Sequence, residues 1–127
     1  MKNWEKGVYL SAGTLATASH LFHAVASTFY EEGAALYTTP LLNLLFVTLF
    51  LFYLKWKKWA YKLSIWYAFW AISINLVFRG QSTEYYGQMA VTMNNWELAE
   101  IFIGFLVGLA FFLPGVRLKF DVEVTTR

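Results

Sequence analysis

The two histidines of the chain, His20 and His23, lie three residues apart in the stretch SHLFHA, within an otherwise apolar run. Imidazole exchanges protons near neutral pH and is also a common metal ligand. Residues three apart on a helix project to the same side, so the pair cannot occupy the two opposite axial positions of one haem. The spacing therefore predicts one edge of an acid–base site or of a metal site.

Glu100 is the carboxyl group that the sequence offers as a partner for these histidines. It lies one turn before Gly104 and Gly108, and two glycines four residues apart are typical of a face where helices pack closely. We therefore expect Glu100 to point into the protein. A histidine and a carboxylate in contact in apolar surroundings can hold a proton between them. His20, His23 and Glu100 are thus the predicted catalytic residues.

The composition indicates the environment in which these groups work. The chain has 127 residues, of which 58% are hydrophobic, 20% aromatic and only 14% charged, whereas an ordinary soluble domain has about 25% charged residues. It contains no cysteine, which excludes disulfides, thiolate metal ligands and thiol nucleophiles. The fold class predicted is an all-α integral membrane protein with a single domain over residues 1–127.

Four apolar windows are each close to the roughly 20 residues that a helix needs to cross a bilayer. They cover about 7–30, 39–56, 61–78 and 96–116, and 79–95 forms an outer loop. These windows predict a compact bundle of four transmembrane helices.

The helix ends carry local signals. Pro40 after Thr39 predicts a helix with threonine as N-cap and proline as its first residue. The run Asn94–Glu97 predicts a capping box that starts the last helix, and Pro114 with Gly115 predicts its end. After it, RLKFDVEVTTR alternates like a strand but is too short for a domain, so we interpret it as a tail. The outer loop is half apolar: a loop resting on the headgroups is the simpler interpretation, and a short interfacial helix or lid over residues 80–93 is the alternative.

Positive charges indicate the orientation. With four crossings, Arg79 alone among the lysines and arginines falls on one side of the membrane. All the others fall on the opposite side. Lysine and arginine concentrate in cytoplasmic segments, so this pattern predicts a multi-pass protein with both termini in the cytoplasm.

The expected depth in the membrane is similar for polar residues of different helices. At about 1.5 Å of rise per residue, the two histidines, Asn43, Asn75 and Glu100 all lie roughly 3 to 9 Å outward of their span centres. Glu97 and Arg79 lie further out. His20 also falls on a stripe of small and polar residues that includes Thr17, whereas His23 borders it. The two criteria predict one polar cluster in the outer half of the bundle, because ionisable groups at such depths are costly unless they have a role.

From this cluster we predict a pocket that binds an apolar small molecule and does acid–base chemistry on it, of an isomerase or hydrolase kind. The predicted partners are membrane lipid, a hydrophobic small molecule and a second copy or larger complex; nothing suggests nucleic acid. No cofactor is predicted. The residues predicted to bind the ligand are Asn43, Asn75, Arg79, Glu97 and Thr17, with aromatic walls from Trp70, Tyr67 and Phe22, and from Trp66 and Phe102.

Three alternatives remain open at the level of sequence. A small aromatic-rich membrane protein also suits a non-catalytic subunit or assembly factor of a larger complex. Glu100 could instead be the protonatable group of an oligomeric proton-coupled transporter. A metal held by the two histidines and Glu100, or a haem with one histidine ligand, is the third.

Overall fold

The computed structural model describes residues 1–79 and 82–125, and every regular element in them is a helix. A long first helix continues into a short 3-10 turn, two further long helices follow, and a short helix and a second 3-10 turn precede the last long helix and a terminal one. In chain order these are α1 (Asn3–Ala26), η1 (Ser27–Phe29), α2 (Ala35–Leu54), α3 (Lys58–Val77), α4 (Ser82–Tyr86), η2 (Gly87–Met89), α5 (Ala90–Phe112) and α6 (Pro114–Thr125).

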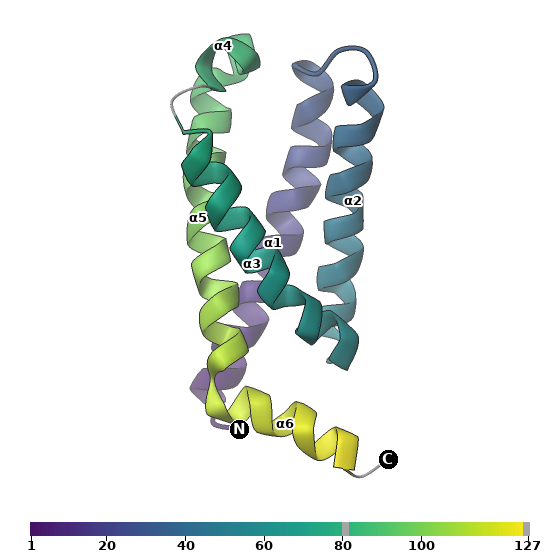
Figure 1. Cartoon of the computed structure of the whole chain (residues 1–127), viewed down its shortest axis with the longest axis vertical. Coiled ribbons are helices and arrows are strands. Elements are labelled where there is room, and N and C mark those ends of the chain that lie inside the picture. The colour runs from purple at the N-terminus through teal and green to yellow at the C-terminus, as the bar shows by residue number, and fades with distance from the viewer. Residues whose placement is uncertain (80–81, 126–127) are drawn as a thin grey trace.

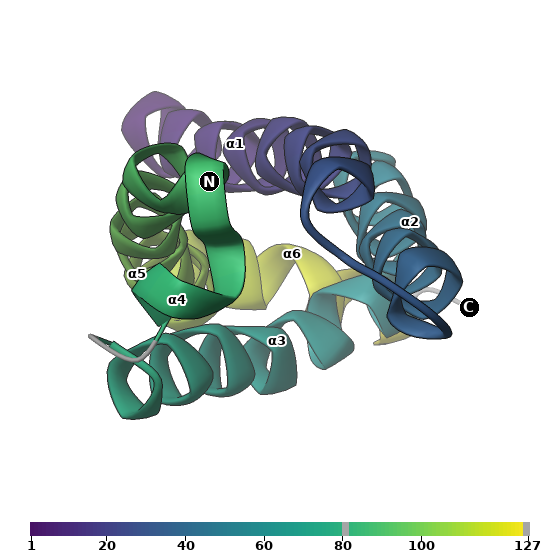
Figure 2. The ribbon, with the colours of Figure 1, turned by 90° about the horizontal axis from the view of Figure 1, so that it is seen from above.

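The four long helices surround a common core, with α1 packed against both α2 and α5, and α3 packed mainly on α5. Figure 1 shows α4 at one end of this bundle and α6 lying across the other, and Figure 2 shows α4 crossing above the ring of long helices. We call these the α4 end and the α6 end. The N-terminus also lies at the α6 end (Figure 1).

Two helical stretches, Ala35–Leu54 and Glu84–Phe112, are long and apolar enough to cross a membrane. The predicted all-α class is confirmed, because every described regular element is a helix. Two of the helical stretches have membrane-spanning character. The close approach predicted at Gly104 is also present: a Cβ there would lie 2.9 Å from Ile72 Cγ1 and 3.3 Å from the carbonyl oxygen of Ala68. This glycine brings α5 against α3.

Two predicted helix starts are wrong. The second helix begins at Ala35, so Pro40 lies inside it rather than at its first position. The cause is Gly33, whose φ of 61° turns the chain so sharply that helical bonding begins with the next residues. The last long helix likewise begins at Ala90, directly after η2, so the run Asn94–Glu97 is interior to α5 and caps nothing.

The predicted tail is also wrong, because residues 114–125 form α6. Pro114 ends the previous helix and supplies the first residue of this one, a position where a missing N–H costs nothing. The strand-like alternation is overridden by Val116 and Phe120, four residues apart, which are both buried against the bundle. Residues 126 and 127 of the predicted tail lie outside the described residues.

A carboxylate ties the first helix to the last one. Glu5 accepts hydrogen bonds from the backbone N–H of Lys2 at 2.9 Å and of Gly115 at 2.8 Å. These two donors hold the pKa of the Glu5 carboxyl below its usual range. At Gly115 the Glu5 carboxylate occupies the space that a Cβ would need, so a larger residue there would displace this carboxylate.

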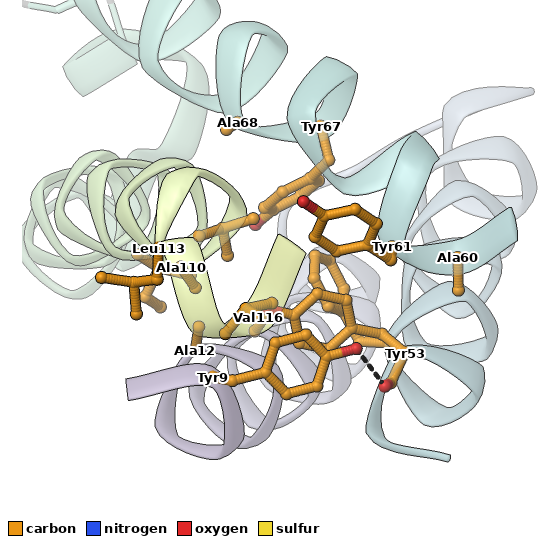
Figure 3. Packing of buried hydrophobic residues seen from close by; sticks show 14 of the residues in the cluster. Tyr9, Ala12, Tyr53, Ala60, Tyr61, Tyr67, Ala68, Ala110, Leu113 and Val116 are labelled. Carbon is orange, nitrogen blue, oxygen red and sulfur yellow. Dashed lines mark hydrogen bonds between the residues drawn. The ribbon is translucent and has the colours of Figure 1, made fainter. Parts of the chain in front are cut away.

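Aromatic rings fill the core next to this contact (Figure 3). Tyr9 stacks on Tyr53 and on Trp56 with ring centroids 4.0 Å apart in both cases, and its hydroxyl donates to the Tyr53 carbonyl at 2.6 Å. Tyr61 stacks on Phe120 at 4.1 Å, which holds α6 against α3. Trp56 adopts a φ of 62°, unusual for a bulky residue, and its stacking on Tyr9 helps to hold that conformation.

Two glycines of α1 provide a paired test of how tightly α1 packs on α2. A Cβ at Gly13 would lie 2.6 Å from Leu54 Cδ2 and 2.8 Å from the ring of Tyr53, which is fully buried, whereas a Cβ at Gly7 would meet nothing within 4 Å. We expect Gly13→Ala to lower the free energy of unfolding by about 1–3 kcal/mol. Gly7→Ala should raise it by up to about 1 kcal/mol through helix propensity. Thermal unfolding in detergent measures both, and shifts in the same direction would contradict this packing.

Candidate ligand pocket and histidine network

The two histidines belong to one hydrogen-bond network that joins α1, α2 and α3. His20 Nδ1 lies 2.7 Å from Asn43 Oδ1, and His20 Nε2 lies 2.6 Å from the hydroxyl of Tyr67. His23 Nδ1 lies 3.1 Å from the same Asn43 oxygen, and its Nε2 lies 2.5 Å from the Tyr30 hydroxyl. Asn43 is therefore the centre of the network, as a shared partner of both rings.

The network fixes where its protons lie. The Asn43 amide nitrogen donates to the Thr39 carbonyl at 2.8 Å, so its oxygen is the atom that faces the histidines. An amide oxygen only accepts, and hence Nδ1 of both His20 and His23 must carry the hydrogen. In the neutral form of each ring, Nε2 then accepts from Tyr67 or Tyr30, so that every ring nitrogen is engaged.

The hydrogen bonds of the two histidines limit their capacity to bind a metal or a haem. A ligating imidazole needs an available nitrogen lone pair, and the lone pairs of His20 and His23 already accept from tyrosine hydroxyls. Within residues 1–79 and 82–125, no three His, Cys, Asp or Glu side chains are grouped so as to hold a metal ion. The predicted set of both histidines with Glu100 is thus not assembled.

A pocket with a volume of about 480 Å³ lies beside this network at the α4 end of the bundle. This volume is in the usual range for small-molecule sites, about 300–1,000 Å³. Side chains from α1, α3, α4 and α5 line it, and most of them are aromatic. They are His23, Trp70, Ile74, Asn75, Phe78, Tyr85, Tyr86, Trp96, Glu97 and Glu100.

Glu100 is the most unusual member of this lining. Its side chain has no exposed area, and neither carboxyl oxygen has a hydrogen-bond partner. The neighbouring Asn75 amide nitrogen donates one hydrogen to the Ala71 carbonyl at 2.7 Å, and its second N–H is the closest donor to the carboxyl. A buried polar group without a partner is costly, so an unpartnered carboxyl facing a pocket indicates a place for a ligand.

Glu97 lies one turn before Glu100 on α5 and is also buried. Its Oε2 atom lies 4.0 Å from Arg79 Nη1, and the same guanidinium nitrogen donates to the Asn94 carbonyl at 3.0 Å. Glu97 is therefore the ion-pair partner of Arg79 among the described residues. Arg79 does not line the pocket itself; it reaches Glu97 from the rim.

The short helix α4 lies over one end of the pocket. Residues 82–86 of the predicted loop are therefore helical. The Tyr85 hydroxyl donates to Glu31 Oε1, and Tyr85 and Tyr86 contact the Tyr30 ring edge-on at 5.8 and 4.7 Å between centroids. These contacts join the covering helix to the end of the first helical segment. Residues 80 and 81 of the predicted loop and lid lie outside the described residues.

The structure brings most of the predicted site residues together. The pocket is lined by His23, Trp70, Asn75, Glu97 and Glu100. Three other predicted residues belong to the hydrogen-bond network without lining the pocket: His20, Asn43 and Tyr67.

The predicted contact between His20 and Glu100 is absent, because both nitrogens of His20 are engaged by Asn43 and Tyr67. Thr17 bonds back to the Gly13 carbonyl at 2.8 Å and has no part in the pocket lining. Phe22 is 42% exposed: it lies two residues beyond His20 and so projects from the opposite side of α1. Trp66 and Phe102 are also exposed.

Five aromatic residues of the site are absent from the predicted set: Tyr30, Phe78, Tyr85, Tyr86 and Trp96. Tyr30 and Trp96 stand at predicted span ends, where aromatic side chains are ordinarily interfacial anchors. Trp96 nevertheless packs on His23 with centroids 4.0 Å apart, and its Nε1 donates to Ser19 Oγ at 2.8 Å. Its spacing of four residues from Glu100 places both on one face of a helix, which is the signal that could have identified it.

The sequence matches no protein-family model and no curated protein, and no solved structure matches the fold. The geometry of the pocket is therefore the basis for inferring the function.

Proposed function

We propose that the chain is a multi-pass membrane protein in which α1, α2, α3 and α5 all cross the bilayer. The membrane-spanning character of α2 and of the stretch containing α5 supports this, as does the packing of α1 and α3 against them. Both termini are then cytoplasmic. The support for this side is the gathering of positive charge on the elements of the α6 end: Lys2, Lys6, Lys55, Lys57, Lys58, Lys62, Arg117 and Lys119.

In that setting, the pocket is a binding site for a hydrophobic small molecule that reaches it from the membrane. The observation that carries this proposal is Glu100, a completely buried carboxyl with no hydrogen-bond partner, which faces a cavity walled mainly by aromatic rings. Apolar walls with one or a few polar groups are the usual construction of such sites.

Glu100 is also the residue to which we assign any proton exchange with the ligand. A general acid or base must have an atom that can reach the ligand. Both histidines use all of their ring nitrogens within the network, whereas neither oxygen of Glu100 has a hydrogen-bond partner among the described residues. The histidine network then acts as a rigid wall that positions His23 and Trp96.

Photolabelling tests the pocket directly. We expect dodecanol that carries a diazirine to label peptides of α3 and α5 saturably when the protein is held in phosphatidylcholine nanodiscs. Ile74→Trp, which fills the pocket from its wall, should abolish saturable labelling. Leu76→Trp is the matched control, because it adds the same side chain to α3 at a position that is 57% exposed. Labelling that never saturates, or that is equal in both variants, would reject the pocket as a binding site.

A further inference from the structure

We propose that the ligand of this pocket carries a protonated amine, and that Glu100 binds the ammonium group through an N–H. This inference rests on the proposed binding function and specifies the chemical class of the ligand. Three properties of the pocket support it: the acidic charge of its lining, its aromatic walls, and the lack of a hydrogen-bond partner for Glu100 among the described residues.

The charges that line the pocket are both acidic. Glu97 and Glu100 lie one turn apart on the same face of α5, and neither a lysine nor an arginine is among the described residues that line the cavity. Arg79 approaches Glu97, with 4.0 Å between Nη1 and Oε2, but no ion pair involving Glu100 is found among the described residues. A buried carboxylate needs an opposite charge or several donors. One monovalent cation in the pocket would complete the pairing of both carboxylates.

The walls suit the same kind of ligand. Trp70, Trp96, Tyr86 and Phe78 surround the cavity with ring surfaces. An aromatic face attracts a cation placed over it, and tryptophan does so most strongly. The same rings provide apolar contact for a hydrocarbon body. An amphipathic amine therefore has both of its parts accommodated by residues already in place.

The missing donors separate an amine with an N–H from a quaternary ammonium ion. Neither oxygen of Glu100 has a hydrogen-bond partner that meets the usual geometric limits among the described residues. An N–H of the ligand would therefore meet a vacant acceptor. A protonated tertiary amine supplies charge and one N–H, a quaternary ion supplies charge alone, and an alcohol supplies a donor without charge.

Competition against the diazirine probe distinguishes these ligands. In phosphatidylcholine nanodiscs at neutral pH, we expect N,N-dimethyldodecylamine to block labelling at a concentration at least about tenfold lower than dodecanol, because charge-assisted hydrogen bonds are roughly twice as strong as neutral ones. Dodecyltrimethylammonium should be weaker than the tertiary amine, and dodecanoate should be weakest. All concentrations are compared after correction for partitioning into the bilayer.

Variants assign the preference to Glu100. Glu100→Gln should remove the advantage of the amine over the alcohol while saturable labelling remains, and Glu100→Asp should retain part of it. Glu84→Gln is the matched control, because it removes an exposed carboxylate from α4 at the same end of the protein and should leave the preference intact. Circular dichroism establishes that each variant is folded.

Several results would overturn the inference. If dodecanol competes as well as the amine while labelling still saturates, the pocket binds ligands but not as an amine site. If the amine preference survives Glu100→Gln, Glu100 is not the anchor, and if the quaternary homologue equals the tertiary amine, the N–H contact is wrong. Labelling that does not saturate with any probe rejects the binding function itself.

Discussion

Asn43→Leu is expected to lower the free energy of unfolding by about 2–5 kcal/mol. It orphans the buried donor of His20 and the half-buried donor of His23, and each fully buried orphan costs about 1–3 kcal/mol. Leucine is similar to asparagine in size, so the cavity left behind is small. What is lost is the oxygen that accepts from Nδ1 of His20 at 2.7 Å and of His23 at 3.1 Å. Equilibrium unfolding in detergent micelles, followed by circular dichroism, measures the change.

Two further variants of α2 make this test specific. Thr48→Val removes a polar group of the same helix that is exposed and bonds only back to the Leu44 carbonyl, so it should change stability by less than about 0.5 kcal/mol. Asn43→Asp keeps an acceptor for both imidazoles and should recover much of the loss. An Asn43→Leu protein as stable as wild type would mean that the histidines find acceptors elsewhere and that the network does not hold them.

Glu100→Met is expected to do the opposite and to raise the free energy of unfolding by about 1–4 kcal/mol, the range seen when buried ionic groups are replaced by apolar ones of similar volume. The carboxyl has no exposed area and no hydrogen-bond partner for either oxygen. Its burial therefore costs stability without a compensating contact inside the protein. The same variant should lose the amine preference, since it lacks the anchor.

Glu97→Met is the control for this second prediction. Glu97 is equally buried and lies one turn away, but Arg79 approaches it to 4.0 Å. Its replacement removes an interaction as well as a buried charge, so no comparable gain is expected. Thermal unfolding of both variants in the same detergent gives the comparison. A Glu100→Met protein less stable than wild type would show that Glu100 has a stabilising partner within the fold.

The difference between the two glutamates also separates stability from function. A group that a protein keeps at the expense of stability is a candidate for a binding role. Glu97 is explained by its neighbour, whereas Glu100 has no explanation among the described contacts of the folded chain. This contrast is the reason that the proposals above depend on Glu100 rather than on the more conspicuous histidines.

The residues that face the core could be predicted from sequence because they depend on helical spacing alone. His20, on the predicted stripe of α1, and Glu100, one turn before the paired glycines of α5, are both fully buried. Depth was a second reliable criterion, since the rise per residue is constant. It placed Asn43 at the level of both histidines, and the structure joins the three by hydrogen bonds.

Pairings between helices could not be predicted in this way. Spacing places His20 and Glu100 inside the same bundle, but which polar atom each one meets depends on the rotation and tilt of the helices. Tyr67 and Asn43 take both nitrogens of His20. Helix starts failed for a different reason: Pro40 is a strong local signal, but the turn at Gly33 begins the helix earlier. The helical conformation of α6 likewise depends on a long-range contact, the packing of Phe120 on Tyr61.

The hydrogen bond between Glu5 and Gly115 joins residues 110 positions apart in the chain. A ribosome makes Glu5 well before Gly115, so this contact cannot form until all the helices between them have been synthesised. Until then, the carboxylate can use only the local bond to Lys2. The closing of α6 across its end of the bundle therefore follows the synthesis of all four long helices, and it depends on the last of them being in place.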